Sequence, residues 1–384
     1  MDGTAEQKHR AGRFIQQPGG YMAFIPNPLP PDPPLEYSVR LVGALARADR
    51  AIGRLDGAAQ ILPNPDLFVA MYVRKEAVLS SQIENTQASL ADVLEYEANV
   101  PGRHLPADVG EVVNYVRAMN YGLERLGSLP LSLRLIREIH AELLRGVRGG
   151  ERTPGEFRTR ANWIGPPACA LADATFVPPP VLQMREALGH LEAYIQQQDE
   201  TPLLVRVGLA HAQFETIHPF LDGNGRVGRL LMTFMLCQRG VLRRPLLYLS
   251  RFLAQRRPEY YDRLMAIRLG GRWEDWLVFF LTGIAEVGEE ATDKARRIID
   301  LQNRHMALIS SRARSLESSR RFLELLFKSP VITMPEAARR LERSRPTVNA
   351  VIRQFLGLGL LVEITGKARY RVFRYQPYVD LLNE

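Results

Sequence analysis

Apolar residues at helical spacing recur along most of this chain and predict a mainly helical protein. After Glu36, the residues Leu41, Leu45, Ile52 and Leu55 follow one another at intervals of three, four and seven, which is the pattern of one buried helix face. Comparable runs cover 67–85, 86–98, 107–126, 131–146, 181–198 and 202–217, and helical sequence resumes beyond residue 229. Turns that contain glycine or proline separate the runs, so we expect an all-α fold built as a helical bundle.

Two stretches depart from this pattern. Residues 18–34 hold seven prolines, which excludes a regular helix and predicts an extended, polyproline-like segment lying against the bundle. Between 155 and 180, a strand-like piece, a loop of small residues and a second strand-like piece end at three consecutive prolines. We interpret this stretch as a small β-hairpin on the helical body.

Residues 311–384 predict a separate C-terminal module. Two short helical runs, RRFLELLFKS and TMPEAARRL, precede a third, SRPTVNAVIRQFLGLG. Thr333 and Glu336 have the spacing of a capping box, and Ser344 is placed as the N-cap of the third helix. The segment LVEITGKARYRVFRY then predicts a strand, a tight turn at Gly366-Lys367 and a second strand. Three helices followed by a hairpin indicate a winged helix-turn-helix domain.

This module also carries most of the net charge. From residue 311 onward there are fourteen Lys and Arg against seven Asp and Glu, a difference of +7, whereas the whole chain has a net charge of +8. A helix in the major groove with a basic wing on the phosphates is a common way to bind DNA. Docking of a protein, or dimerisation, is the alternative use of such a module. The basic residues expected to meet DNA are Arg343, Arg345 and Arg353 on the third helix and Lys367, Arg369, Arg371 and Arg374 on the hairpin.

Length and composition exclude several classes of protein. A chain of 384 residues predicts two or three domains. No apolar stretch is long enough to cross a bilayer, and the start lacks the apolar core of a secretory signal. With only Cys169 and Cys237, the chain has no disulfide framework and no cysteine-rich zinc site. We therefore expect a cytoplasmic protein without a membrane partner.

The stretch HPFLDGNGRVGR, residues 218–229, predicts a phosphate-binding site. The glycines of the turn DGNG let consecutive backbone N–H groups face a ligand, and the helix that the turn opens adds positive potential at its N-terminus. Arg226 and Arg229 are three residues apart and so share a helix face, where both guanidinium groups can reach phosphate oxygens.

His218 and Asp222 add chemistry to this turn. A histidine has a pKa near neutrality and suits a general base, and Asp222 offers a hard oxygen ligand for the Mg²⁺ that a nucleotide polyphosphate brings. The spacing is not that of a Walker A loop, and a helix precedes the turn where a dinucleotide-binding motif needs a strand. A zinc site through His211 is not expected, because Pro219 breaks the helix and no third His or Cys lies nearby. His211 is interpreted as a buried, hydrogen-bonded imidazole.

These twelve residues match the motif HPFx[D/E]GNGRxxR of the Fic family at every fixed position, so the chain resembles that family. PGEFR (154–158), NWIG (162–165) and FVPPP (176–180) are similar to the region that forms the flap of Fic proteins. The likeness extends over most of residues 10–300. It implies a Fic-type helical bundle with a β-hairpin flap, divided into an N-terminal region at 1–105, a catalytic core at 106–310 and the winged helix-turn-helix domain at 311–384.

The resemblance implies protein adenylylation, which is the transfer of AMP from Mg·ATP to a Ser, Thr or Tyr hydroxyl of a target protein. His218 would deprotonate the attacking hydroxyl and Asp222 would hold the metal. Self-modification is expected, and the flap would hold the target by strand pairing. The residues implied for the nucleotide are Gly223, Asn224 and Gly225 as the anion hole, Arg226 on the polyphosphate, Arg229 on the γ-phosphate, and Tyr260 and Tyr261 near the adenine, although two adjacent tyrosines on a helix also suit ordinary packing.

The segment SSQIEN, Ser80 to Asn85, matches the inhibitory signature [S/T]xxxE[G/N] of the same family. Ser80 and Glu84 are four residues apart and share a helix face. By the resemblance, Glu84 would pair with Arg229 and withhold that cation from the γ-phosphate. The sequence thus predicts an autoinhibited enzyme. On the pattern alone, a Ser–Glu pair on a helix is otherwise ordinary solvated surface.

Two other functions stay open at this point. One is a DNA-binding regulator whose Fic core only senses nucleotide. The presence of His218 argues against it, because binding ATP does not require a base. The other is removal of AMP at the same site, because a glutamate such as Glu84 can position a water molecule. We expect a homodimer from the architecture, and the sequence names neither the target protein nor the signal that relieves inhibition.

Overall fold

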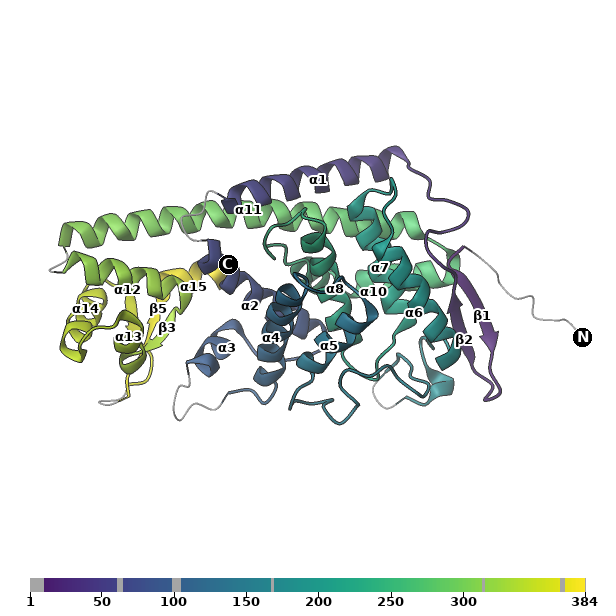
Figure 1. The fold of residues 1–384 in the computed structure, drawn as a ribbon, viewed down its shortest axis with the longest axis horizontal. Coiled ribbons are helices and arrows are strands. Elements are labelled where there is room, and N and C mark those ends of the chain that lie inside the picture. Colours follow the sequence, from purple (N-terminus) through teal and green to yellow (C-terminus); the bar gives the residue numbers. More distant parts are fainter. Residues whose placement is uncertain are drawn as a thin grey trace, which may run out of the picture.

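The computed structural model describes residues 10–60, 65–98, 105–166, 169–312, 315–366 and 370–383. The prediction of a mainly helical fold is confirmed (Figure 1). The helices are α1 (Val39–Gln60), α2 (Pro65–Ile83), α3 (Leu90–Glu97), α4 (Val109–Arg125), α5 (Leu133–Leu143), α6 (Val181–Gln196), α7 (Leu203–Ile217), α8 (Asn224–Gln238), α9 (Ser250–Gln255), α10 (Arg257–Gly270), α11 (Trp273–Arg312), α12 (Leu316–Lys328), α13 (Met334–Leu341), α14 (Arg345–Gly357) and α15 (Gln376–Asn383), with a 3-10 turn at Leu171–Asp173. The strands are β1 (Gly12–Gln16), β2 (Met22–Pro26), β3 (Val331–Thr333), β4 (Leu361–Glu363) and β5 (Val372–Tyr375).

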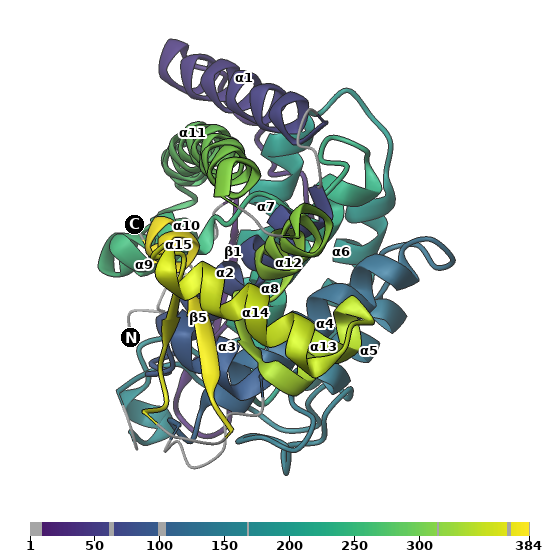
Figure 2. The same ribbon diagram turned by 90° about the vertical axis from the view of Figure 1, so that its left-hand side faces the viewer.

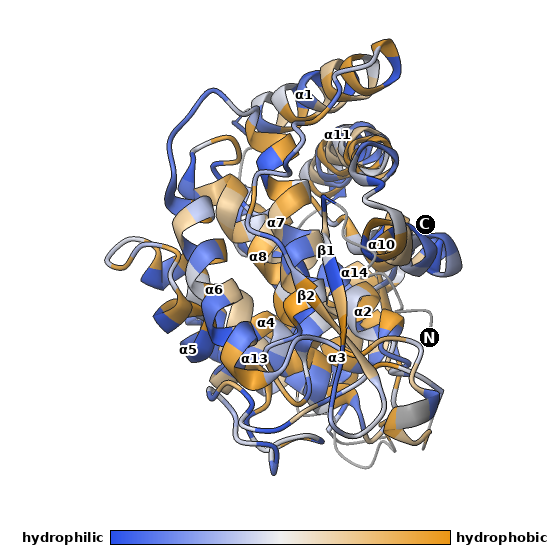
Figure 3. Cartoon of the chain, turned by 90° about the vertical axis from the view of Figure 1, so that its right-hand side faces the viewer, coloured by the Kyte–Doolittle hydropathy of each residue, from blue (hydrophilic) through white to orange (hydrophobic). Residues whose placement is uncertain are grey.

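Helix α7 is the centre of the bundle. Every residue from Leu204 to Ile217 is buried. Most of this run is apolar, and buried polar side chains such as Arg206, His211 and Thr216 have hydrogen-bond partners. Helices α1, α6, α8 and α11 pack around it. The outer helix α1, by contrast, carries both hydrophilic and hydrophobic residues (Figure 3). The chain therefore leaves the middle of the core at His218, directly into the glycine turn.

The longest helix, α11, runs along the upper side of the molecule in Figure 1 with α1 beside it. The two helices approach closely where Gly288 faces Ala51, since a Cβ on Gly288 would lie 3.1 Å from the Ala51 Cβ. No helix in the described part of the chain combines the length and the apolar sequence that a membrane crossing requires.

The proline-rich start forms more structure than the sequence predicted. β1 and β2 make an antiparallel hairpin in which Gly12 pairs with Pro26, so part of the expected polyproline-like segment is a strand. Gly12 and the residues near it carry no strong strand signal, and the ladder depends on packing: Phe14 meets Phe24 edge to face with ring centroids 5.0 Å apart. The rest of the segment, from Asn27 to Ser38, contains no helix or strand.

The hairpin expected at 155–180 is reduced to one antiparallel bridge. Ile164 and Phe176 exchange both backbone hydrogen bonds, at 2.9 and 3.0 Å. A longer ladder does not form among the described residues, and prolines at 166 and 178–180 have no N–H group to donate to one. The Phe24 N–H also donates to the Val177 carbonyl at 2.9 Å, so the second arm of this flap lies between Ile164 and β2.

The C-terminal unit, defined here as residues 315–383, contains α12, α13, α14 and a three-stranded antiparallel sheet in the order β3-β5-β4. The predicted helices and hairpin strands are present, and Thr333 caps α13 by accepting the Glu336 N–H. β3 and α15 were not expected. Lys367 and Arg369 lie outside the described residues. The winged helix-turn-helix and the domain boundaries at 105/106 and 310/311 stay predictions. The boundary at 310/311 falls in the last turn of α11.

Close packing of α4 on α8 gives a test of the bundle. A Cβ on Gly122 would lie 2.3 Å from Cζ of the buried Phe234. We expect Gly122→Ala to lower the free energy of unfolding by about 1–3 kcal/mol through overpacking, measured by urea denaturation. Gly189→Ala in α6 is the control, since no atom lies within 4 Å of its added Cβ and alanine favours helix. Equal stability of the two variants would contradict this packing.

Candidate active site

The glycine turn connects two buried helices through two left-handed residues. α7 ends at His218, which has φ 49° and ψ 60° and donates its N–H to the Phe214 carbonyl. α8 begins after Gly223, which has φ 77°, a conformation that glycine adopts without strain. The N-terminus of α8 has no side-chain cap, so its first N–H groups are suited to an anionic ligand.

Asn224 holds the turn in shape. Its amide oxygen accepts the Phe220 N–H and its amide nitrogen donates to the Phe220 carbonyl, both at 2.8 Å. Asn224 is 2% exposed. Because both polar atoms of its side chain are already bonded inside the turn, we expect Asn224 to serve the predicted anion hole through its backbone N–H.

The His218 imidazole lies in a positive, poorly solvated place. Burial, followed by the guanidinium groups of Arg268 and Arg158, lowers the pKa of His218 to about 3. Nδ1 is buried and has no hydrogen-bond partner among the described residues. The backbone is fixed instead, because the His218 carbonyl accepts from Arg158 Nε at 3.0 Å and from Asn162 Nδ2 at 3.2 Å. The ring is therefore neutral and able to accept a proton.

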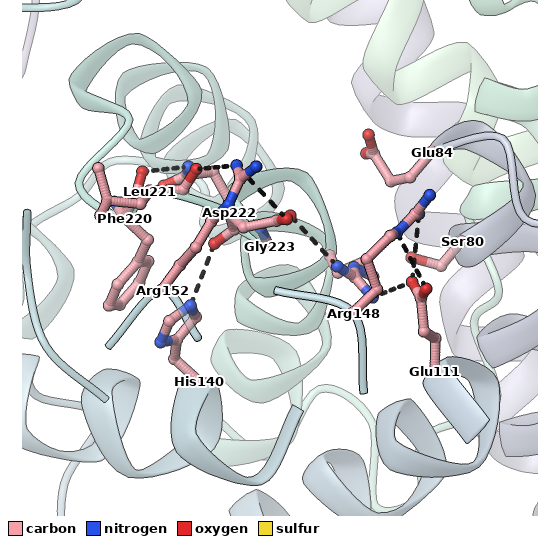
Figure 4. Close-up of polar contacts among 12 residues, drawn as sticks. Ser80, Glu84, Glu111, His140, Arg148, Arg152, Phe220, Leu221, Asp222 and Gly223 are labelled. Atoms are coloured by element: carbon pink, nitrogen blue, oxygen red, sulfur yellow. Dashed lines mark hydrogen bonds and ion pairs between the residues drawn. The ribbon is translucent and has the colours of Figure 1, made fainter. Parts of the chain in front are cut away.

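Arg226 and Asp222 form the next layer of the site. Figure 4 shows Asp222 with its neighbours Arg152 and Gly223. Arg226 is 2% exposed and donates to Glu111 Oε2 at 3.0 Å and to Asp222 Oδ1 at 3.4 Å. Glu111 also pairs with Arg148 at 3.2 Å. The Asp222 side chain is 29% exposed, and its Oδ2 lies 3.9 Å from Arg152. An accessible carboxylate thus lies between two guanidinium groups, those of Arg226 and Arg152.

Arg229 is bonded to the last turn of α2 and to the residue that directly follows the helix. It donates from Nε to Ser80 Oγ at 2.7 Å, and from Nη2 to the Ser80 carbonyl at 2.9 Å and to Glu84 Oε1 at 2.8 Å. Burial alone would raise the pKa of Glu84, but the Arg229 guanidinium outweighs it and holds this pKa below its usual range. The predicted Glu84–Arg229 pair is therefore present in the structure.

The Glu84 carboxylate also covers the start of α8. A Cβ on Gly225 would lie 2.2 Å from Glu84 Oε1, so only glycine allows this approach. A carboxylate at a helix N-terminus is electrostatically favourable. Asn85 has φ 67° and is exposed; asparagine tolerates this left-handed conformation, which ends α2 and places Glu84 over the turn. Glu84 thus occupies the place where an anionic ligand of the turn would bind.

Comparison with known proteins identifies this arrangement. The model of the Fic/DOC family N-terminal region matches residues 42–124, and the Fic/DOC family model matches residues 130–236. The chain belongs to the Fic/DOC family. The second match contains the whole Fic motif, and the first contains Ser80, Glu84 and Asn85.

Similar curated proteins carry adenylyltransferase names. An Aquifex aeolicus relative, named as a probable protein adenylyltransferase, is 28% identical over 181 residues, which are 46% of this chain and 51% of the relative. Proteins named protein adenylyltransferase Fic are 30% identical over 158 residues in Drosophila grimshawi (40% of this chain, 30% of the relative) and 29% identical over 195 residues in Aedes aegypti (49% and 36%). The chain spans about half the length of the first relative and about a third of the insect proteins.

Two solved structures share the fold. A Fic family protein of Desulfovibrio desulfuricans G20 has a TM-score of 0.57 at 18% identity, covering 89% of this chain and 98% of its own. A Fic domain-containing signaling protein of Bacteroides thetaiotaomicron has a TM-score of 0.52 at 15% identity, covering 66% and 97%. At these identities the likeness concerns the Fic fold alone.

Several residues that support the Fic motif carried no sequence signal. His140 of α5 stacks on Phe220 with centroids 3.8 Å apart. Its Nδ1 accepts the Gly155 N–H at 2.8 Å, so its Nε2 carries the proton and donates to the Asp222 carbonyl at 3.1 Å. Burial lowers the pKa of His140 to about 4. His140 and Glu111 lie in amphipathic helices without a motif, so periodicity could mark them only as helix residues.

The two tyrosines expected near adenine have different surroundings. Tyr260 is 1% exposed, and its hydroxyl is hydrogen-bonded to His211 Nε2 at 2.9 Å. His211 Nδ1 bonds the Gly228 carbonyl at 3.0 Å, so His211 is the buried, satisfied imidazole that was predicted. Tyr261 is 37% exposed, with the Arg257 guanidinium 5.5 Å from its ring centroid. Of the two, Tyr261 is the one a ligand can reach, and an adenine contact stays a prediction.

The donor set at the turn fits a metal that arrives with a nucleotide. Among the described residues, no group of three or more His, Cys, Asp and Glu could hold a metal ion. Asp222 offers one hard carboxylate, which is how Mg²⁺ is usually bound when phosphates and water supply the other ligands. The Fic turn therefore fits Mg²⁺ carried by a polyphosphate better than a metal held by the protein alone.

The neutral His218 gives a pH test. Because the folded pKa lies below the unfolded value, the unfolded chain takes up a proton as the pH falls below about 6.5 and the contribution of His218 to stability is lost toward pH 3. His218→Asn keeps a residue that tolerates positive φ and removes this term. From pH 7 to 5, the variant should lose roughly 1–2 kcal/mol less unfolding free energy than the parent, measured in urea. An equal loss in both proteins would show that folding does not lower the pKa of His218.

Proposed function

We propose that this Fic protein is an autoinhibited protein adenylyltransferase that moves AMP from ATP to a hydroxyl group of a target protein. The observation that carries the proposal is the pairing of Arg229 with Ser80 and Glu84 beside an otherwise complete phosphate turn. The adenylyltransferase names of similar proteins support the same reaction. ATP and a protein hydroxyl are then the two substrates.

The turn supplies the electrostatics of phosphate binding. The N–H groups at the start of α8 face the phosphates and stabilise the charge that develops on the attacked phosphate. Arg226 stays fixed by Glu111 and Asp222 and adds positive charge beside the turn. Arg229 has to exchange the Glu84 carboxylate for an oxygen of the γ-phosphate. A Mg²⁺ ion held by Asp222 would neutralise charge on the departing pyrophosphate.

His218 acts as the general base. Its neutral imidazole accepts the proton of a Ser, Thr or Tyr hydroxyl, whose oxygen forms a bond to the α-phosphorus while the bond from this phosphorus to the pyrophosphate oxygen breaks. Arg268 and Arg158 oppose protonation before the hydroxyl arrives. The products are the adenylylated protein and pyrophosphate.

The flap offers one open backbone edge for the target. Phe176 pairs with Ile164, and Val177 pairs with Phe24, so the second arm has neighbours on both sides. On the first arm, the backbones of Trp163 and Gly165 form no hydrogen bonds among the described residues, and Trp163 is 42% exposed. An extended target segment would pair with residues 162–165 by strand addition.

Other functions of the same site are less well supported. Removal of AMP uses a water molecule held by a glutamate, whereas the Glu84 carboxylate is bonded to Arg229. A protein that only senses nucleotide has no need for a desolvated imidazole beside the phosphates. Adenylyl transfer uses both groups.

Glu84→Gly tests the autoinhibition. Removing the carboxylate frees Arg229 for the γ-phosphate, so self-modification measured with α-labelled ATP should rise by about tenfold or more, equivalent to roughly 1.4 kcal/mol. His218→Ala in the same background should abolish the labelling. Intact-mass analysis should show the addition of AMP rather than of phosphate.

Glu286→Gly is the matched control, because Glu286 pairs with Arg256 on the surface between α11 and the turn before α10. It should label like the parent protein. Labelling of Glu84→Gly at the parent level would show that Glu84 is not a brake, and labelling that survives His218→Ala would show that His218 is not the base.

A second, independent candidate is DNA binding by the C-terminal unit. Arg345 and Arg353 of α14 are exposed, and neither has an acidic partner among the described residues. Figure 2 looks onto this end of the molecule, with α13 and α14 in front. An open groove of about 460 Å³ lies beside α14. Arg312, Ser315, Thr347, Ala350, Val351, Arg353 and Gln354 line it. Unpaired arginines beside a polar groove suit the phosphates of a duplex.

Arg345→Ala and Arg353→Ala in the full chain test this candidate by mobility shift with a DNA duplex. Each should weaken binding and reduce the slope of log affinity against log salt by about 1. Arg134→Ala, which removes an exposed arginine of α5, should leave both unchanged. A parent protein that fails to shift the duplex at low salt would exclude the DNA function.

A further inference from the structure

Helix α2 is buried between the catalytic core and the C-terminal unit. It packs against α4, α8 and α9 on the core side and against α12 on the other. From Met71 to Val78, every residue except Arg74 is buried. A helix enclosed in this way needs a partner for each of its polar groups. Those partners come from the two different parts of the chain.

The core side of α2 ends at the phosphate turn. Glu76 is 4% exposed and accepts hydrogen bonds from the Ser250 hydroxyl, from the Ser250 N–H at 3.3 Å and from the Tyr115 hydroxyl at 3.3 Å. One turn later Ser80 bonds to Arg229, and one further turn on, beyond the helix end, Glu84 does the same. Glu76 and Ser80 thus hold α2 against the core, and Glu84 at its end lies over the turn.

Lys75 makes the corresponding link to the C-terminal unit. It is 8% exposed, and its Nζ donates to the Leu382 carbonyl at 2.5 Å, in the last turn of α15. Ser80 lies roughly 140° around the helix from Lys75, so the two contacts are on different sides of α2. Burial, followed by Lys294, lowers the pKa of Lys75 to about 7, and the amine donates to the carbonyl in either protonation state.

The rings around this link connect the same elements. Lys75 Nζ lies 5.7 Å from the centroid of Tyr248, which meets Tyr72 of α2 edge to face at 4.9 Å. On the other side, Tyr378 of α15 packs on Phe327 of α12 at 4.7 Å. α15 and α12 therefore form one packed unit beside α2, and Lys75 bonds directly to that unit.

We propose that the C-terminal unit regulates the phosphate turn through α2. Docking of α15 on Lys75 and of α12 on α2 holds the helix where Glu84 reaches Arg229. A partner that draws the unit away from α2 frees Arg229. This inference rests on the proposed autoinhibition by Glu84, and it assigns to the C-terminal unit the control of that brake.

The test is a double-mutant cycle in the full chain, because a purely structural role of Lys75 would not make the effect of its substitution depend on Glu84. Lys75→Met should raise self-labelling from α-labelled ATP by about fivefold or more, the lower end of typical coupling between sites. In the Glu84→Gly background, where the brake is already absent, the same substitution should change nothing. The two effects are then non-additive, as expected when both residues act through one contact.

Arg239→Met is the matched control. Arg239 donates from Nη2 to the carbonyls of Ile195 and Gln197 at the end of α6, both at 3.0 Å, so it resembles Lys75 as a cation on helix-terminal carbonyls but lies within the catalytic core. Its replacement should leave labelling at the parent level. Lys75→Arg, which retains a donor, should restore low labelling.

A second measurement covers the case in which Lys75→Met does not fold. Coupling is reciprocal, so Glu84→Gly should increase amide hydrogen exchange in α15 relative to the parent. Unchanged exchange, or labelling of a folded Lys75→Met protein at or below the parent level while Glu84→Gly is active, would overturn the coupling and leave the brake intact. Labelling of Glu84→Gly at the parent level would overturn both proposals.

Discussion

The structure of the phosphate turn depends on one buried guanidinium group, that of Arg229. Arg229 is 1% exposed and could not stay there unpaired, because an isolated buried charge is far too costly. Ser80 and Glu84 pair with it. Any anionic ligand that takes the place of Glu84 on Arg229 must displace this carboxylate, and we propose that the energy of this exchange keeps the site closed. The Glu84–Arg229 pair thus connects ligand binding to the position of α2.

The geometry around this pair explains residues that otherwise look unremarkable. A side chain on Gly225 would displace the Glu84 carboxylate, because Glu84 Oε1 would lie 2.2 Å from its Cβ. Asn85 turns the chain into a left-handed conformation directly after Glu84. On the opposite side, Glu111 neutralises Arg226. The structure therefore holds both motif arginines in place, Arg226 by Glu111 and Arg229 by Ser80 and Glu84. In the function that we propose, Glu84 is the partner that leaves.

The sequence predicted the helices and the glycine turn well, because both are local signals. Helical periodicity located most of the helices to within a few residues, and the motif at 218–229 identified the turn. The residues that support the turn come from distant elements: His140 under Phe220, Glu111 on Arg226 and Arg158 on the His218 carbonyl. Their roles arise from tertiary contacts, which periodicity does not encode. The strand β1 was missed for the same reason, since its ladder depends on Phe24 across the hairpin.

The most direct test of this account is a crystal structure of the Glu84→Gly variant with Mg²⁺ and an ATP analogue that cannot be cleaved at the α-phosphate. In that structure we expect phosphates on the N–H groups at the start of α8, the γ-phosphate on Arg229, the metal on Asp222, and the α-phosphate within reach of a hydroxyl bonded to His218. A nucleotide bound elsewhere, or an Arg229 that stays bonded only to Ser80 while the turn is empty, would contradict it.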